Sequence, residues 1–111
     1  LFHVVDGVEA LDVLHGTHHT IVLPHPYLIL LDINIPRMSG LELLQVIRQE
    51  TQLRRSVVFV ITTSKNERDI STAYNYQVAG YILKDKISYD FADIALLLVR
   101  YQSLVEWPQS A

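Results

Sequence analysis

Three residues able to handle a phosphoryl group, Asp32, Thr62 and Lys84, each stand at the end of a short, largely apolar run. A carboxylate can act as a nucleophile, while a hydroxyl and an ammonium can bind phosphoryl oxygens. If the runs are parallel strands, their carboxyl ends lie at one edge of a sheet, where the three side chains converge. The residues therefore indicate a phosphoryl-transfer site with Asp32 as the nucleophile.

The residues around these three predict strands that alternate with helices. Asn34, Pro36 and Gly40 mark a turn after Asp32, and Ser39 with Glu42 forms a capping-box pattern at the start of a helix. The alternation predicts an α/β fold, a parallel sheet with helices on both faces. We expect strands over residues 1–5, 28–32, 57–62 and 80–84, and helices over 8–15, 39–50, 67–76 and 89–107.

Helical spacing of apolar residues also predicts which helix positions are buried. The expected buried positions are Leu41, Leu44 and Ile47 in the second helix, and Phe91, Ile94, Ala95, Leu98, Tyr101 and Val105 in the last one.

Composition narrows the class of protein. The 111 residues suit a single domain over 1–111, and the net charge of -3 argues against a nucleic-acid footprint. No apolar run approaches the roughly 20 residues needed to cross a membrane. Leu1 to Val5 lack a basic leader and a small-residue cleavage site, so we do not expect them to be a signal peptide. The absence of cysteine is compatible with a cytoplasmic protein and excludes thiolate sites.

The stretch Leu30-Leu31-Asp32-Ile33-Asn34-Ile35-Pro36 with Gly40, joined to Thr62, Tyr81 and Lys84, resembles the receiver domain of two-component response regulators. The resemblance covers nearly the whole chain and implies the flavodoxin-like doubly wound sheet with strand order 2-1-3-4-5. In its detailed residue sequence, the chain is similar to single-domain regulators paired with phytochrome-type histidine kinases.

The resemblance implies a role for each matching residue. Asp32 would take the phosphoryl group from a kinase phosphohistidine, and Lys84 would pair with a phosphoryl oxygen. Thr62 would bond another oxygen and move toward it, and Tyr81 would report that movement as a switch. Mg²⁺ would be held by the Asp32 carboxylate and the backbone carbonyl of Asn34.

The resemblance also implies partners. The upstream partner would be a histidine kinase of phytochrome type, and output would pass to a downstream protein target. A homodimer would form through the last two helices and the strand between them. The protein would act in the cytoplasm as a signalling phosphoprotein, not as a conventional enzyme, without nucleic acid or membrane as partner.

The chain departs from the family pattern in two ways. The family's first strand and first helix, with an acidic pair that binds metal, are absent from this chain. We therefore expect a gap between the strands that end at Val5 and Asp32, poor metal binding and unstable folding of these residues alone. In addition, Asp85 follows Lys84 where the family usually has proline. We therefore expect the conformation of the Lys84 loop to differ from that in the family.

Two other functions remain open. A pseudo-receiver, a binding module of the same fold that is never phosphorylated, is favoured by the missing acids and by Asp85. A hydrolase using Asp32 on small phosphate esters is disfavoured, because no substrate-enclosing cap or second catalytic acid is evident. The histidines match no metal-binding spacing and are expected to be mostly solvated loop residues: His3, His15, His18, His19 and His25.

Overall fold

A computed structural model describes residues 1–18, 20–86 and 91–108, including the backbone but not the side chain of Phe91. The predicted elements are confirmed with small shifts of their ends, and Tyr89, the expected start of the last helix, lies outside the described residues. The strands are β1 (Phe2–Val4), β2 (Leu28–Leu31), β3 (Val57–Thr62) and β4 (Gly80–Leu83). The helices are α1 (Gly7–His15), α2 (Gly40–Gln49), α3 (Glu67–Asn75) and α4 (Phe91–Leu104), with a short 3₁₀ helix η1 (Lys84–Lys86) after β4.

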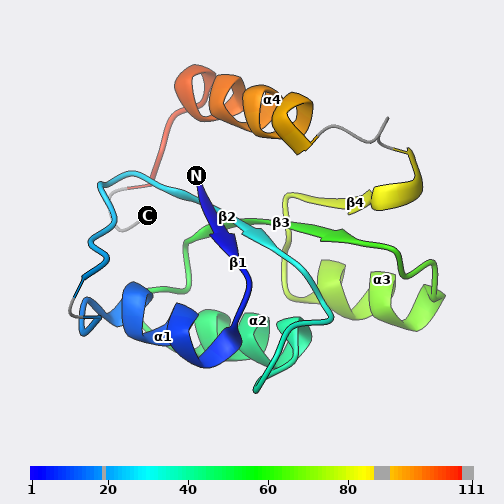
Figure 1. The fold of residues 1–111 in the computed structure, drawn as a ribbon, viewed down its shortest axis with the longest axis horizontal. Helices are drawn as coiled ribbons and strands as arrows, with labels where there is room; N and C mark the ends of the chain where they lie inside the picture. Colours follow the sequence, from blue (N-terminus) through cyan, green and yellow to red (C-terminus); the bar gives the residue numbers. More distant parts are fainter. Residues whose placement is uncertain (19, 87–90, 109–111) are drawn as a thin grey trace.

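The described strands form one parallel sheet in the order β1-β2-β3-β4. Helices α1, α2 and α3 cover one face of this sheet, and α4 covers the other (Figure 1). The expected α/β class, with a parallel sheet and helices on both faces, is confirmed. The carboxyl ends of all these strands therefore lie at the same edge.

The prediction of a gap between the first two strands is wrong. Strand β1 pairs directly with β2, and the register places Phe2 opposite Ile29 and Val4 opposite Leu31. The pairing satisfies backbone N–H and C=O groups that would otherwise line two unpaired edges. One consequence is that side chains of β1 lie next to the end of β2.

Strand β2 is buried on both faces, as predicted. Ile29 and Leu31 point into a cluster that includes residues of α1, α2 and α3, whereas Leu28 and Leu30 belong to a cluster with Leu98 of α4. All four β2 side chains are fully buried. Burying such a side chain contributes about 1.5–3 kcal/mol, so β2 is the centre of the core and anchors the residue that follows it.

Two details of the predicted helix burial are wrong. In α2, Leu44 and Ile47 are buried as expected, but Leu41 is only partly buried and Leu43 is fully buried instead. In α4, apolar residues occur on several faces, and only one face can contact the sheet. Leu98 is buried there, whereas the expected Ile94, Ala95 and Tyr101 are partly buried, Val105 lies beyond the helix end, and Leu96, Leu97, Val99 and Leu104 are exposed.

Side-chain caps begin the helices. The Asp6 carboxylate accepts hydrogen bonds from the backbone N–H groups of Val8 and Glu9, and Ser39 Oγ accepts one from Glu42 at 3.2 Å. Asp6 also accepts a 2.8 Å bond from Arg37 Nε, and this bond is the main reason why the pKa of Asp6 is lowered. The Arg37 contact ties the loop that follows Asp32 to the start of α1.

Gly40 lets the start of α2 lie directly against the backbone of Asp32. Its N–H donates to Ile33 O at 2.7 Å. A β-carbon at this position would lie 2.2 Å from the backbone oxygen of Asp32, a distance at which something must shift. Gly40 therefore helps to set the position of Asp32.

We expect Gly40→Ala to lower the free energy of unfolding by about 2 kcal/mol or more, because backbone atoms must move to admit the methyl group. Urea unfolding followed by circular dichroism measures the change. Gly16→Ala is the matched control: nothing lies within 4 Å of its added β-carbon, although its φ of 74° costs about 1 kcal/mol. An equal or smaller effect at Gly40 would contradict the close-packing argument.

Candidate functional site

The structure brings Asp32 and Lys84 into direct contact. Asp32 follows β2, and Lys84 follows β4. Lys84 Nζ donates to Asp32 Oδ2 at 2.6 Å, and the backbone N–H of Asn34 donates to Oδ1 at 3.1 Å. The Asp32 side chain is 18% exposed and that of Lys84 45% exposed. A carboxylate that solvent can reach is thus held beside a partly exposed cation.

The ion pair lines a hollow of about 270 Å³ at the carboxyl ends of the strands. We call it the Asp32 hollow. Asp32 is the one acidic side chain among its described lining residues, which are His3, Val4, Val5, Asp32, Asn34, Ile35, Ile61 and Lys84. The hollow therefore combines a single negative group with a cation, an imidazole and several apolar side chains.

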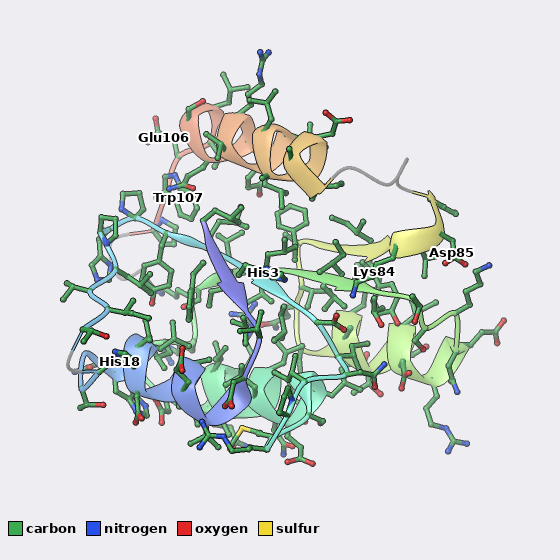
Figure 2. The ribbon with its side chains drawn as sticks, viewed as in Figure 1. His3, His18, Lys84, Asp85, Glu106 and Trp107 are labelled. Carbon is green, nitrogen blue, oxygen red and sulfur yellow. The ribbon has the colours of Figure 1, made fainter. Side chains whose placement is uncertain are left out.

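His3 belongs to this hollow, and sequence reasoning missed it. His3 lies in the edge strand β1, and Lys84 directly follows the other edge strand, β4 (Figure 2). Burial is the main cause that lowers the pKa of His3 below its ordinary value, while the charge of Asp32 raises it and that of Lys84 lowers it. His3 is near Asp32 because β1 pairs with β2, and no sequence pattern signalled that pairing.

Thr62 is not brought into the Asp32 hollow. Its side chain is fully buried, and its Oγ1 accepts a 3.2 Å hydrogen bond from the backbone N–H of Ser64. The β3 residue that lines the hollow is the preceding one, Ile61. The convergence expected from the sequence is thus seen for Asp32 and Lys84, whereas Thr62 lies at the same sheet edge but turns to the next loop.

Tyr81 contacts that same loop. Its hydroxyl donates to the carbonyl of Ser64 at 2.9 Å, and burial, followed by the charge of Asp69, raises the pKa of this hydroxyl. Tyr81 is therefore a protonated donor at neutral pH. Ser64 Oγ in turn donates to Asp69 in α3 at 2.7 Å. Ser64 connects Thr62, Tyr81 and α3.

Asp85 forms an ion pair with Lys65 at 2.9 Å. Both side chains are at least half exposed, so the pair contributes little to stability. The pair connects the loop after β3 to η1. The expected effect of Asp85 on the Lys84 loop stays a prediction.

The described residues offer few ligands for a metal ion. Within residues 1–18, 20–86 and 91–108, no group of three His, Cys, Asp or Glu side chains is placed to hold one, and His19 lies outside this description. Asp32 and Asn34 both line the Asp32 hollow, and carboxylate and carbonyl oxygens are the donors that Mg²⁺ accepts together with water. These donors fit a weakly held divalent cation.

No described helix has the length and apolar character needed to cross a membrane.

The sequence has clear relatives. Residues 2–94 match the family described as response regulator receiver domain. Response regulator Rcp1 of Synechocystis sp. is 40% identical over 81 residues, which are 73% of this chain and 55% of Rcp1. The probable methanogenesis regulatory protein FilR2 of Methanothrix harundinacea is 37% identical over 79 residues, 71% of this chain and 50% of FilR2. The chain thus spans about half the length of these curated relatives.

Solved structures share the fold. The Mn²⁺-bound form of Rcp1 has a TM-score of 0.71 at 34% identity and covers 93% of this chain and 75% of that chain. The phosphorylated cyanobacterial phytochrome response regulator RcpA has a TM-score of 0.70 at 33% identity, with 97% and 74% covered. A receiver domain from Rhodospirillum rubrum has a TM-score of 0.75 at 30% identity, with 95% and 75% covered.

We expect His3 to titrate with a midpoint below about 6.5, the ordinary histidine value. Asp32→Asn should lower the midpoint further, and Lys84→Met should raise it, because the two charges act in opposite directions. NMR of the imidazole protons during a pH titration measures all three midpoints.

The lowered pKa has a consequence for stability. Below about pH 6.5 the unfolded chain binds more protons at His3 than the folded protein does, so stability falls as the pH drops through this range. The same titration in urea provides the unfolded reference value. A folded midpoint above that reference, or shifts of the same sign in both variants, would contradict the placement of His3 within reach of both charges.

Proposed function

Since this chain belongs to the response regulator receiver family, we propose that it takes a phosphoryl group from a histidine kinase onto Asp32. A carboxylate oxygen attacks phosphorus, the P–N bond to the kinase imidazole breaks, and an aspartyl phosphate forms. The single observation that supports this role most directly is the 2.6 Å contact of Lys84 Nζ with Asp32 Oδ2. It provides a cation where the phosphoryl oxygens would collect negative charge.

Lys84 can follow the incoming group at little cost. Its side chain is 45% exposed, and exposed ion pairs are typically worth no more than about 1 kcal/mol. The ammonium can therefore leave the bare carboxylate and pair with a phosphoryl oxygen. The added dianion offers it a stronger partner than the single carboxylate.

Thr62 and Tyr81 are proposed as the switch that responds to this charge. Thr62 would leave its bond with Ser64 N–H and bond a phosphoryl oxygen. Because Tyr81 also bonds Ser64, and Ser64 Oγ bonds Asp69 of α3, a displacement of the loop reaches β4 and α3 together. The charge of the added phosphoryl group would then shift the equilibrium of this loop between two conformations.

A divalent cation, proposed to be Mg²⁺, would be held by the Asp32 carboxylate and the Asn34 carbonyl. When bound, it would offset negative charge on the phosphoryl oxygens. Support comes from the oxygen donors of the Asp32 hollow and from the relative Rcp1, for which an Mn²⁺-bound form is known. With a single carboxylate available, binding is expected to be weak.

The kinase is proposed to be of phytochrome type, because RcpA is a phytochrome response regulator. We propose that the exchange takes place in the cytoplasm, that output passes to a downstream protein, and that the chain acts as a signal transducer rather than a turnover enzyme. A homodimer through α3, β4 and α4 is supported by the exposed apolar side chains of α4. Those side chains are Leu96, Leu97, Val99 and Leu104.

A pseudo-receiver is the second candidate function. Two observations favour it: Asp32 is the single acidic group among the described residues of its hollow, and Thr62 turns away from that hollow. In this alternative the Lys84–Asp32 pair is a permanent structural contact. The protein would then bind its partners without being phosphorylated.

Incubation with Mg²⁺ and acetyl phosphate, followed by intact-protein mass spectrometry, tests the proposal. We expect a gain of one phosphoryl group, no gain in Asp32→Asn and at least about tenfold slower labelling in Lys84→Met, a loss of about 1.4 kcal/mol or more in transition-state stabilisation. Asp93→Asn, which removes an exposed carboxylate on α4, is the matched control and should label normally. Absence of labelling in the unmodified chain would support the pseudo-receiver, and steady turnover of unrelated phosphate esters would indicate a hydrolase.

Tyr81→Phe separates the switch from the chemistry. The variant loses the hydroxyl that donates to Ser64, but keeps the ring and leaves Asp32 untouched. We expect labelling within about twofold of the unmodified chain, whereas the phosphorylation-dependent amide shifts in α3 should shrink. NMR spectra before and after labelling measure those shifts. Unchanged shifts would remove Tyr81 from the proposed switch.

A further inference from the structure

A second hollow, of about 380 Å³, lies at the amino ends of the strands, opposite the ends where Asp32 lies. Val57, the first residue of β3, is in its wall, whereas the Asp32 hollow lies at the other end of the strands. Since Val57 and Ile61, which line the two hollows, are four residues apart along β3 at about 3.3 Å each, the two hollows are separated by about 13 Å of strand. We call the second one the arginine hollow, and its polar and ring-bearing lining includes Arg48, Arg54, Arg55, Ser56, Tyr101 and Pro108.

Arg48 contributes a charge that no carboxylate neutralises among the described residues. Its guanidinium donates instead to four backbone carbonyls. Burial lowers the pKa of Arg48, but arginine remains protonated in proteins. The positive charge is therefore kept in the wall of the hollow. The carbonyls belong to Tyr76 at 2.7 Å, Ser56 at 2.7 Å, Arg54 at 2.9 Å and Gln77 at 3.1 Å.

Arg54 and Arg55 add two exposed guanidinium groups to this wall. Neither takes part in the ion pairs formed within the described parts of the chain. The whole protein has a formal net charge of -3, so three guanidinium groups in one hollow are a local reversal of sign. Such a reversal concentrates anions at that point of the surface.

Ser56 lies in the same wall but does not offer its hydroxyl to the hollow. The residue is only 3% exposed, and its Oγ is buried without a hydrogen-bond partner among the described residues. A buried oxygen is out of reach of a ligand in the hollow, so the two exposed arginines provide the bonds to an anion.

We propose that the arginine hollow binds a small molecule that carries a phosphate monoester next to an apolar or aromatic portion. The phosphate has three free oxygens and a double negative charge. Arg54 and Arg55 bond these oxygens with their forked donors. Tyr101 and Pro108 contact the apolar portion, because they line the same hollow.

Isothermal titration with phenyl phosphate tests the proposal, carried out in the Asp32→Asn chain so that the phosphoacceptor does not contribute. We expect saturable binding that is at least about tenfold weaker in the double variant Arg54→Ala/Arg55→Ala, which loses two charge-assisted contacts. Arg68→Ala removes an exposed arginine on α3 and should leave the affinity unchanged within about twofold. Absence of saturable binding, or an equal loss in the Arg68 control, would overturn the proposal.

Ser56→Ala is a second control. Since the hydroxyl is buried and has no described partner, the variant should unfold at the same or a higher temperature and bind phenyl phosphate within about twofold of the Asp32→Asn chain. Inorganic phosphate should bind more weakly than phenyl phosphate, and benzyl alcohol should not bind. Binding of an oligoglutamate peptide without binding of phenyl phosphate would contradict the assignment of a small phosphorylated ligand.

Discussion

The contact between Lys84 and Asp32 depends on how far apart parallel strands lie. Strand β3 separates β2 from β4, so the ends of β2 and β4 are two strand spacings apart, about 10 Å. A lysine side chain, on its four-carbon stem, can cross most of that distance above the end of β3, and a short side chain cannot. The Lys84–Asp32 contact therefore requires this strand order, this register and a side chain as long as that of lysine.

Much of this arrangement could be predicted because local chemistry signals it. The apolar run before Asp32, the turn that follows it, and the Ser39 cap are short-range features, and each lies where the sequence places it. The parallel sheet then follows from the alternation of strands and helices. Lys84 reaches Asp32 because both follow strands of that sheet.

The remainder depends on tertiary choices that no local pattern encodes. Strand β1 could pair with β2 or leave room for another strand, and the choice to pair is what brings His3 to the Asp32 hollow. Helix α4 has apolar residues on several faces, so periodicity could not select the face around Leu98. Thr62 was expected to point at Asp32 because it ends its strand, but its hydroxyl instead satisfies the N–H of Ser64.

The two ends of the parallel strands carry different chemical groups. The described lining of the Asp32 hollow, at the carboxyl ends of the strands, has a single carboxylate with its lysine, whereas the arginine hollow at the amino ends has guanidinium groups. Arg48 links the loop before β3 to the loop before β4 through bonds to Ser56 and Gln77. The same side chain thus contacts the segments that precede two strands, and the far ends of these strands lie at the Asp32 hollow.

The limited burial of α4 side chains also determines which part of the fold unfolds locally. Leu98 is the one described side chain of α4 that is fully enclosed, while β2 is enclosed on both sides. The amide protons of α4 should therefore exchange with solvent through a local detachment of the helix, and those of β2 only when the whole fold comes apart. Such a helix can leave and return while the central strands, and the carboxylate that follows them, stay in place.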